Sequence, residues 1–306
     1  MNAARFAIID LGTNTFHLLI ADDQKQIILE EKAPVKMGQG GINQGIITDL
    51  STERAIACLK LFSEKCRELK VGNIHAFGTS ALRNAKNSSV IIDRAKKETG
   101  IEIQIISGEE EARLIYLGVR QAVPLGNEKS LIVDIGGGSV EFIIANSKEI
   151  LWKQSIEVGG QRLLEQFHRN DPILPEELLA LNRYLSERLS PLKEPLRQHH
   201  PKTLVGSSGT FETLSDIYCS RKNLPNPKNP ESPLTLDMFE KIYHDLIRKN
   251  KTERIAMPGM MEWRAEMIVV TCSLIRFLFQ SHPFDRIRVS RFSLKEGALF
   301  GEATTD

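Results

Sequence analysis

The sequence predicts an α/β protein made of two related halves, each with a mixed β-sheet flanked by helices. The first observation is an internal repeat. The stretches IIDLGTNTFHLLIA (8–21) and IVDIGGGSVEFIIA (132–145) share one pattern of strand, aspartate, glycine turn and strand, and Asp134 lies 124 positions after Asp10. The second is that both halves continue with a third strand and then alternate helices and strands. The third is the length of 306 residues, which suits about two domains.

Hydrophobic spacing places the elements of the first half. A helix capped by Ser51 or Thr52 follows the third strand, because apolar residues between Leu59 and Leu69 recur at a 3-4-3 spacing. Gly100 ends the next helix, and the alternation in IEIQII is typical of a strand. The predicted strands are 6–10, 15–21, 26–31, 74–77 and 101–106, and the later helices are 88–99 and 108–121.

The second half repeats this order from Leu131 onward. The four prolines of KNLPNPKNPESP (222–233) predict a loop. The predicted strands are 131–134, 140–145, 150–157, 203–205 and 285–290. Helices are predicted from about 160 and after 206–210, and at 175–190, 235–249, 262–279 and 293–303.

Charge and composition exclude several classes of partner. The net charge is +1 at pH 7, so no excess of basic residues favours nucleic acid or an anionic membrane. No signal peptide opens the sequence, and no apolar run is long enough to span a bilayer. The four cysteines lack the spacing of metal ligands and predict reduced thiols. We therefore expect a cytoplasmic protein without nucleic-acid or membrane partners.

The two glycine turns predict an anion site. Because Gly136, Gly137 and Gly138 carry no side chains, a phosphate can approach the backbone N–H groups closely. Thr15 and Ser139 would each add a hydroxyl donor. One such turn could be a flexible hairpin, but two copies with the aspartate in register favour a phosphate site.

Asp10 and Asp134 end the strands that precede these turns. Their carboxylates would repel a phosphate unless a cation lies between them. Mg²⁺ suits this position, since it prefers one or two carboxylates together with phosphate oxygens and water. The pattern therefore predicts a magnesium site beside the phosphate.

Two other segments are candidate phosphate ligands. Thr79, Ser80 and Arg83 follow a short strand, and arginine suits bidentate phosphate binding. GSSGT (206–210) opens a helix, so Gly206 and Ser207 form a second small-residue loop at a helix N-terminus. Taken alone, a surface arginine and a plain helix cap explain these segments equally well.

Three adjacent glutamates open the helix in SGEEEARL (107–114), where the helix dipole favours acids. A solvated helix end would explain them, and so would a general base that faces a cleft. Because successive helical residues point about 100° apart, they cannot all face it, and the local sequence does not say which one does. His17, Trp152 and Trp263 are interpreted as packing residues.

Together these motifs resemble the exopolyphosphatase / guanosine pentaphosphate phosphohydrolase family, within the actin-like, sugar-kinase-like superfamily. The resemblance spans nearly the whole chain. It rests on seven segments in order: DLGTNTFHLLIA, GTSALRNAKN, ISGEEEARLIYLGV, VDIGGGSVEF, VGGQRLLEQF, VGSSGT and SLKEGALFGE.

The resemblance implies two actin-like (ribonuclease H-like) domains with mixed five-stranded sheets and an active site in the cleft between them. We place the domains at 1–124 and 125–306 and expect the C-terminal helix, about 293–306, to pack back on the first. The implied activity is Mg²⁺-dependent removal of the terminal phosphate from polyphosphate or guanosine pentaphosphate (pppGpp), with a homodimer as the candidate assembly.

The resemblance also implies roles for individual residues. Glu111, directly before ARL, corresponds to the catalytic glutamate, and Arg83 to a phosphate ligand. Asp134 corresponds to a metal ligand, with Glu141 in a supporting role and Asp10 reaching the ion through water. The backbone of both turns should hold phosphate, at Gly12, Thr13, Asn14 and Thr15 in the first and from Gly136 to Ser139 in the second.

Three positions depart from the family pattern. Lys36 stands where an arginine is common, Lys295 replaces the arginine of GLREG, and Thr271 lies in a helix that usually carries a small residue and glycine there. The additional C-terminal domains of longer members are absent, which favours short chains or pppGpp as substrate.

The mechanism that we expect is in-line attack by water on the terminal phosphorus, with Glu111 as general base. Mg²⁺ and Arg83 would neutralise the phosphate. Two alternatives are an ATP-dependent small-molecule kinase of the same superfamily and a non-enzymatic sensor of alarmone or polyphosphate.

Overall fold

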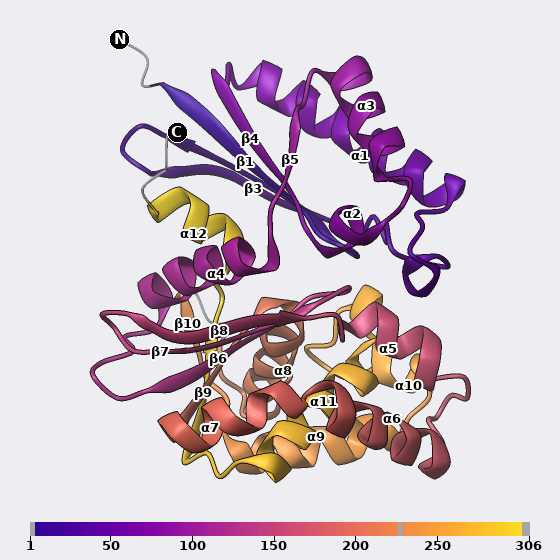
Figure 1. Ribbon diagram of the computed structural model, residues 1–306, viewed down its shortest axis with the longest axis vertical. Helices are drawn as coiled ribbons and strands as arrows, with labels where there is room; N and C mark the ends of the chain where they lie inside the picture. Colours follow the sequence, from indigo (N-terminus) through magenta and orange to yellow (C-terminus); the bar gives the residue numbers. More distant parts are fainter. Residues whose placement is uncertain (1–3, 226–228, 302–306) are drawn as a thin grey trace.

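The computed structural model describes residues 4–225 and 229–301. It contains two mixed sheets, one above the other in Figure 1, with most helices on their outer sides. The predicted fold class, α/β with two mixed sheets flanked by helices, is confirmed. The division into residues 1–124 and 125–306 stays a prediction.

The first sheet has five strands in the order β3-β2-β1-β4-β5. β1, β2 and β3 are antiparallel, whereas β4 and β5 run parallel to β1. Because Asp10 pairs with His17 across β1 and β2, the turn at 12–15 lies at the edge of the sheet where β4 ends. The strands are β1 (Arg5–Leu11), β2 (Phe16–Asp22), β3 (Ile27–Ala33), β4 (Asn73–Gly78) and β5 (Ile103–Ile105).

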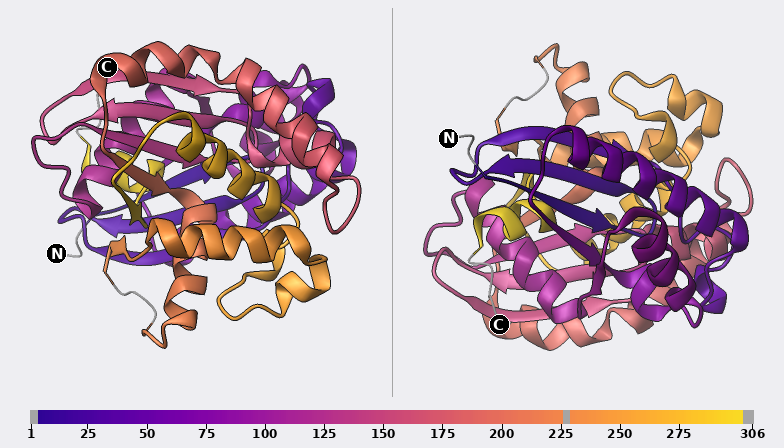
Figure 2. Two further views of the ribbon diagram at one scale, coloured as in Figure 1. Left: turned by 90° about the horizontal axis from the view of Figure 1, so that it is seen from below. Right: turned by 90° about the horizontal axis from the view of Figure 1, so that it is seen from above.

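Two long helices, α1 (Asp49–Glu68) and α3 (Ser88–Thr99), cover the outer face of this sheet (Figure 2, right). The helix α1 begins earlier than predicted. Its cap is Thr48, whose hydroxyl accepts a hydrogen bond from the Ser51 N–H at 3.2 Å, so the predicted cap at Ser51 or Thr52 is wrong. A 3₁₀ turn η1 (Ile42–Gln44) and a short helix α2 (Ser80–Asn84), neither predicted, lie on the side that faces the second sheet.

The second sheet has six strands in the order β10-β11-β9-β6-β7-β8, one more than predicted. The additional strand, β10, lies inside the segment predicted to be a loop and pairs with the C-terminal part of β11. Two residues are too short for hydrophobic alternation to reveal a strand. The strands are β6 (Ser130–Ile135), β7 (Val140–Ala145), β8 (Ile150–Ile156), β9 (Thr203–Ser207), β10 (Glu231–Ser232) and β11 (Arg286–Ser290).

Helices cover the lower face of the second sheet (Figure 2, left). They are α5 (Gly160–Phe167), α6 (Pro175–Arg188), η2 (Ser190–Leu192), α7 (Lys193–His199), α8 (Ser208–Arg221), α9 (Leu236–Arg248), α10 (Lys251–Ile255), η3 (Glu262–Arg264) and α11 (Ile268–Ser281). The single helix predicted at 262–279 is interrupted between η3 and α11. This break matters for the site, because it carries Arg264 to the cavity described below.

Two helices, α4 (Gly108–Ala122) and α12 (Leu294–Phe300), lie between the sheets (Figure 1). They cross closely because both have glycine at the contact. A Cβ on Gly297 would lie 1.7 Å from the Leu114 carbonyl oxygen, and one on Gly118 would lie 2.0 Å from that of Ser293. The part of the predicted C-terminal helix beyond residue 301 lies outside the described residues.

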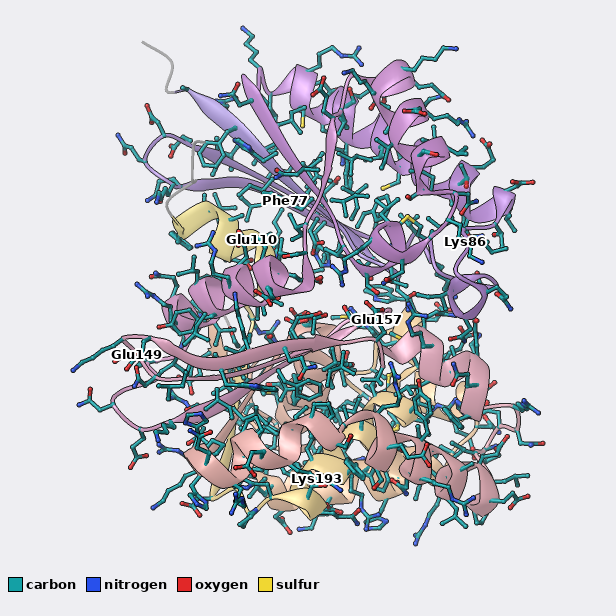
Figure 3. All side chains as sticks on the ribbon, in the orientation of Figure 1. Phe77, Lys86, Glu110, Glu149, Glu157 and Lys193 are labelled. Atoms are coloured by element: carbon teal, nitrogen blue, oxygen red, sulfur yellow. The ribbon has the colours of Figure 1, made fainter. Side chains whose placement is uncertain are left out.

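Each of these two helices also packs on one sheet. The helix α4 shares a hydrophobic cluster with Ile132 and Ile143 of the second sheet. Leu299 of α12 packs with Ile8 and Leu19 of the first sheet. Phe77, labelled in Figure 3, packs against both clusters. No helix in the described part of the chain is long and apolar enough to cross a membrane.

Candidate active site between the two sheets

The two aspartate–glycine turns line one cavity of about 90 Å³ between the sheets. Most of the predicted site residues line it, although they come from segments far apart in the sequence. These are Asp10, Gly12, Thr13, Asn14, Thr15, Thr79, Ser80, Glu111, Asp134, Gly136, Gly137, Gly138 and Ser139. Four predicted residues do not line it, namely Arg83, Glu141, Gly206 and Ser207.

The first glycine has the same steric role in both turns. A Cβ on Gly12 would lie 2.7 Å from the Thr15 carbonyl oxygen, and a Cβ on Gly136 would lie 3.0 Å from that of Ser139. Each turn is therefore too tight for a side chain at this position. The internal repeat read from the sequence is thus a repeat of backbone geometry.

The carbonyl groups of both turns bond to the segments behind them. In the first turn, Thr13 O accepts from the Gly38 N–H at 2.9 Å. In the second, Gly137 O accepts from the Gln161 N–H at 2.8 Å and Gly138 O from the Gly159 N–H at 3.1 Å. The carbonyl oxygens therefore have partners on one side of each turn.

The N–H groups of the same two turns have no hydrogen-bond acceptor in the described part of the chain. Within the described residues, no acceptor is bonded to the N–H groups of Thr13, Asn14, Gly137 and Gly138. Successive unpaired N–H groups in a turn form an anion-binding nest. Two such nests line one cavity, and this arrangement suits the oxygens of a phosphate group.

Asp134 is held by three hydroxyl groups. Ser207, Ser208 and Ser293 donate to its carboxylate at 2.6, 2.7 and 2.5 Å. Ser207 was predicted to bind phosphate, but in the structure its hydroxyl donates a hydrogen bond to Asp134. Gly206 does not reach the cavity either, because it packs under the Phe211 ring, 2.1 Å from where its Cβ would be.

Asp10 differs from Asp134 in its surroundings. No hydrogen bond to its carboxylate exists among the described residues. Burial and the nearby Glu111 raise the pKa of Asp10 to about 8. A half-buried carboxyl group that is repelled by its neighbours and receives no hydrogen bond from the described residues is one that a cation would stabilise in the ionised form.

The structure shows which of the three adjacent glutamates faces the cavity, a question that the local sequence left open. Ser107 caps α4 by accepting from the Glu110 N–H at 3.1 Å, which fixes the phase of the helix. Glu110 then pairs with Arg113 at 2.8 Å and is only partly buried; Figure 3 labels it beside α4. Glu109 is exposed, and Glu111 alone of the three is buried and lines the cavity.

Burial raises the pKa of Glu111 to about 7, although the adjacent Arg83 acts in the opposite direction. Arg83 Nη1 donates to the Glu111 carboxylate at 2.8 Å and to the Ile106 carbonyl at 3.2 Å. A pKa near neutrality is what a general base at neutral pH requires.

Glu141 lies directly opposite Asp134 in the β6–β7 pairing. Burial raises its pKa well above the usual value, and Glu111 and Asp134 add to the effect. Its carboxylate accepts from the Ser155 hydroxyl at 2.6 Å. Glu141 therefore lies behind the cavity wall, close enough to Glu111 and Asp134 for their charges to affect its pKa.

The carboxylates fit a magnesium ion that keeps most of its ligands from substrate and water. Within residues 4–225 and 229–301, no three His, Cys, Asp or Glu side chains are close enough to form a complete metal cage. Mg²⁺ needs only one or two carboxylates when phosphate and water supply the rest. Asp10 and Asp134 both line the cavity and meet that requirement.

Several basic residues at the site carried no local signal in the sequence. Lys32, Arg264, Arg291 and Lys295 line the same cavity, and of these only Lys295 had been singled out. The Nε of Arg264 is buried and has no hydrogen-bond partner among the described residues. Burial lowers the pKa of Arg264 despite the nearby carboxylates of Glu212 and Asp134.

The other two departures lie outside the cavity. The Lys36 ammonium group contacts Glu266 at 3.4 Å, on the far side of the first turn. The Thr271 hydroxyl bonds within α11, at 3.2 Å to the Met267 carbonyl, and its methyl group lies against Gly160 at the start of α5.

Comparison with known proteins covers both halves of the chain. The sequence matches the Ppx/GppA phosphatase family over residues 19–306. It is 44% identical to an exopolyphosphatase from Cytophaga hutchinsonii ATCC 33406, covering 97% of this chain and 96% of that chain, with a TM-score of 0.92. It is 28% identical to the Aquifex aeolicus member of the Ppx/GppA protein family, covering 98% and 97%, with a TM-score of 0.77.

Proposed function

Since the chain belongs to the Ppx/GppA phosphatase family, we propose that it removes the terminal phosphate from inorganic polyphosphate or guanosine pentaphosphate in a reaction that depends on Mg²⁺. The exopolyphosphatase activity named for the Cytophaga hutchinsonii protein supports a phosphoanhydride substrate. The actin-like arrangement of two sheets about a central site supports the same conclusion.

One observation carries this proposal. The four residues of the two turns whose N–H groups have no acceptor among the described residues line the same cavity as Glu111, the buried carboxyl group whose pKa is raised to about 7. The N–H groups suit the oxygens of a terminal phosphate, and Glu111 suits the proton of an attacking water.

Asp10 and Asp134 would hold Mg²⁺. When bound, the ion supplies positive charge that draws electron density from the phosphate oxygens. Asp134 is fixed in place by its three serine hydroxyls, while Asp10 is free of hydrogen bonds from described residues and available to the ion or its water.

The protein's own groups then provide positioning and proton transfer. Glu111 takes the proton of the water, and Arg83, bonded to it at 2.8 Å, orients its carboxylate. The two nests hold the phosphate so that water and leaving group are in line. Hydrogen-bond donors aimed at a developing charge are the largest contribution that such a site can make.

Phosphate release tests the proposal. Guanosine pentaphosphate, tripolyphosphate and long polyphosphate are incubated side by side with the protein, with and without Mg²⁺. We expect orthophosphate from at least one substrate, with loss of release when EDTA removes the metal. Equal inactivity on all three, with tight binding, would instead identify a sensor, and transfer of phosphate from ATP to an acceptor would identify a kinase.

A further inference from the structure

Glu157, the residue after β8, accepts hydrogen bonds from both halves of the protein. On the side of the first sheet, the Ser80 hydroxyl donates at 2.6 Å, the Asn84 side-chain amide at 2.7 Å and Arg83 Nη2 at 3.4 Å. On its own side, Arg162 Nη2 donates at 2.8 Å. Figure 3 labels Glu157 between the two halves, and its side chain is 30% exposed.

Arg162 links this carboxylate to the second turn of the site and to η1 of the first half. Its Nε donates to the carbonyl of Gly138 at 2.8 Å, and its Nη1 crosses to the carbonyl of Ile42 at 2.9 Å. The guanidinium group is thus fixed at three points. Glu157 is held by it at the edge of the phosphate site.

Two of the side chains that donate hydrogen bonds to Glu157, Ser80 and Arg83, are also candidate donors to a bound phosphate. Ser80 lines the cavity, and its hydroxyl is turned to Glu157. Arg83 does not line the cavity, because its guanidinium lies between Glu111 and Glu157. A carboxylate that accepts from a hydroxyl, an amide and a guanidinium uses the same donors that would bind a phosphate oxygen.

We propose that Glu157 is an internal anion that competes with phosphate for Ser80 and Arg83, and so weakens the binding of the orthophosphate product. This inference rests on the proposed function, since it concerns the same phosphate site. Substrate must draw Ser80 and Arg83 away from Glu157. After cleavage, Glu157 takes them back, and the product leaves.

Glu157→Gln tests this proposal because the amide keeps the shape of the side chain and removes its charge. Calorimetry measures the Kd for orthophosphate in the presence of Mg²⁺. We expect Kd for orthophosphate to fall about tenfold, since one negative charge near the bound anion is lost. In phosphate-release assays, inhibition by added orthophosphate should become stronger by the same factor.

Glu165→Gln is the matched control. Glu165 also crosses between the halves, accepting from the Gly40 N–H at 2.8 Å and the Asn43 amide at 3.3 Å, but it bonds none of Ser80, Asn84 and Arg83. We expect Kd for orthophosphate to stay within twofold in this variant. Thermal melts show whether both variants are folded before binding is compared.

The outcomes separate this inference from the proposed function. Tighter orthophosphate binding in E157Q alone supports it. Unchanged or weaker binding in E157Q overturns it, as does equal tightening in both variants, which would reflect a looser contact between the halves. Wild-type protein that binds orthophosphate but releases none from any substrate would contradict the proposed function while leaving this test valid.

Discussion

The two aspartate–glycine turns share a backbone but differ in what surrounds the aspartate. In the second turn, Asp134 is held by three serine hydroxyls at 2.5 to 2.7 Å. In the first turn, Asp10 receives no hydrogen bond from the described residues, and its pKa is raised to about 8. Opposite Asp134 stands Glu141, and opposite Asp10 stands His17.

This difference teaches that the two halves repeat the backbone geometry of the turn but not the surroundings of its aspartate. The second turn is a fixed support, since its aspartate accepts three hydrogen bonds before any ligand arrives. The first turn carries an aspartate whose ionisation depends on the charged groups around it. Neither turn holds the proposed base, which is on α4 between the two sheets.

The largest effect is expected from Glu111→Gln, which tests whether both turns are passive in proton transfer. We expect kcat to fall about 10³-fold, because a positioned general base contributes roughly 10² to 10⁴. Kd for tripolyphosphate should change less than threefold, as the nests remain. Phosphate release and calorimetry measure the two quantities. A near-normal kcat would show that Glu111 is not the general base. Asp10 or Asp134 would then have to take the proton, and the turns would not be passive.

A matched pair, Asp10→Asn and Asp134→Asn, tests the difference between the turns directly. Both should lower phosphate release about 100-fold, in line with the loss of a metal ligand or its support. Their effects on stability should have opposite signs. Asp134→Asn removes a charged acceptor from three buried hydroxyls and should cost about 1–3 kcal/mol.

Asp10→Asn should instead stabilise the metal-free protein at high pH. The pKa of Asp10 is about 8 in the folded protein against 3.8 for a free aspartate, so between these values only the folded state keeps the proton. Stability is therefore lost as pH rises through about 8, and asparagine removes this loss. Thermal melts in EDTA at pH 6 and pH 9 measure it, and equal shifts for the two variants would contradict the comparison.

The sequence predicted the parts of this site that depend on short segments. Glycines and an aspartate at matching positions revealed both nests, because tight turns and strand ends are local features. Glu111 could be chosen among three glutamates only through the family resemblance. The structure supplies the physical reason, since the cap at Ser107 sets the helix so that Glu110 faces out and Glu111 faces in.

Contacts between distant segments could not be predicted in the same way. Glu157 meets Ser80 across 77 positions, and Ser293 meets Asp134 across 159. Nothing in the residues around Glu157 indicates such partners. Ser207 looked like a phosphate ligand at a helix start, yet parallel pairing of β9 with β6 places it beside Asp134.

The pH dependence of kcat/KM should show a smaller effect, and it tests whether Asp10 of the first turn titrates in the active protein. Glu111 must be ionised to act as a base, and its pKa is raised to about 7, so kcat/KM should fall tenfold per pH unit below about 7. At limiting Mg²⁺, kcat/KM should rise further through about 8 as Asp10 loses its proton. Asp10→Asn should abolish the upper step and leave the lower one. A single step that is unchanged in this variant would show that Asp10 does not titrate in the active protein.

The smallest effect is expected at the positions opposite the two aspartates, Glu141 and His17. Burial raises the pKa of Glu141 and lowers that of His17 well below its usual value. Burial therefore favours the uncharged form of both side chains in the metal-free site. A cation reverses this for Glu141 only, because its positive charge favours the ionised carboxyl group and releases a proton. Glu141→Gln should therefore raise the Mg²⁺ concentration for half-maximal activity about tenfold and reduce the protons released on Mg²⁺ binding.

His17→Asn is the control for this last effect, because an uncharged imidazole releases no proton near pH 8 when a cation binds nearby. Its Mg²⁺ requirement should stay within twofold of the wild-type value. Mg²⁺ titrations of activity and of proton release at pH 8 provide both measurements. Equal changes in the two variants would mean that packing beside the aspartate, and not charge, distinguishes the turns. A change in Glu141→Gln alone would show that Glu141 becomes negatively charged when the metal binds. The equivalent position in the first half, His17, cannot supply that charge.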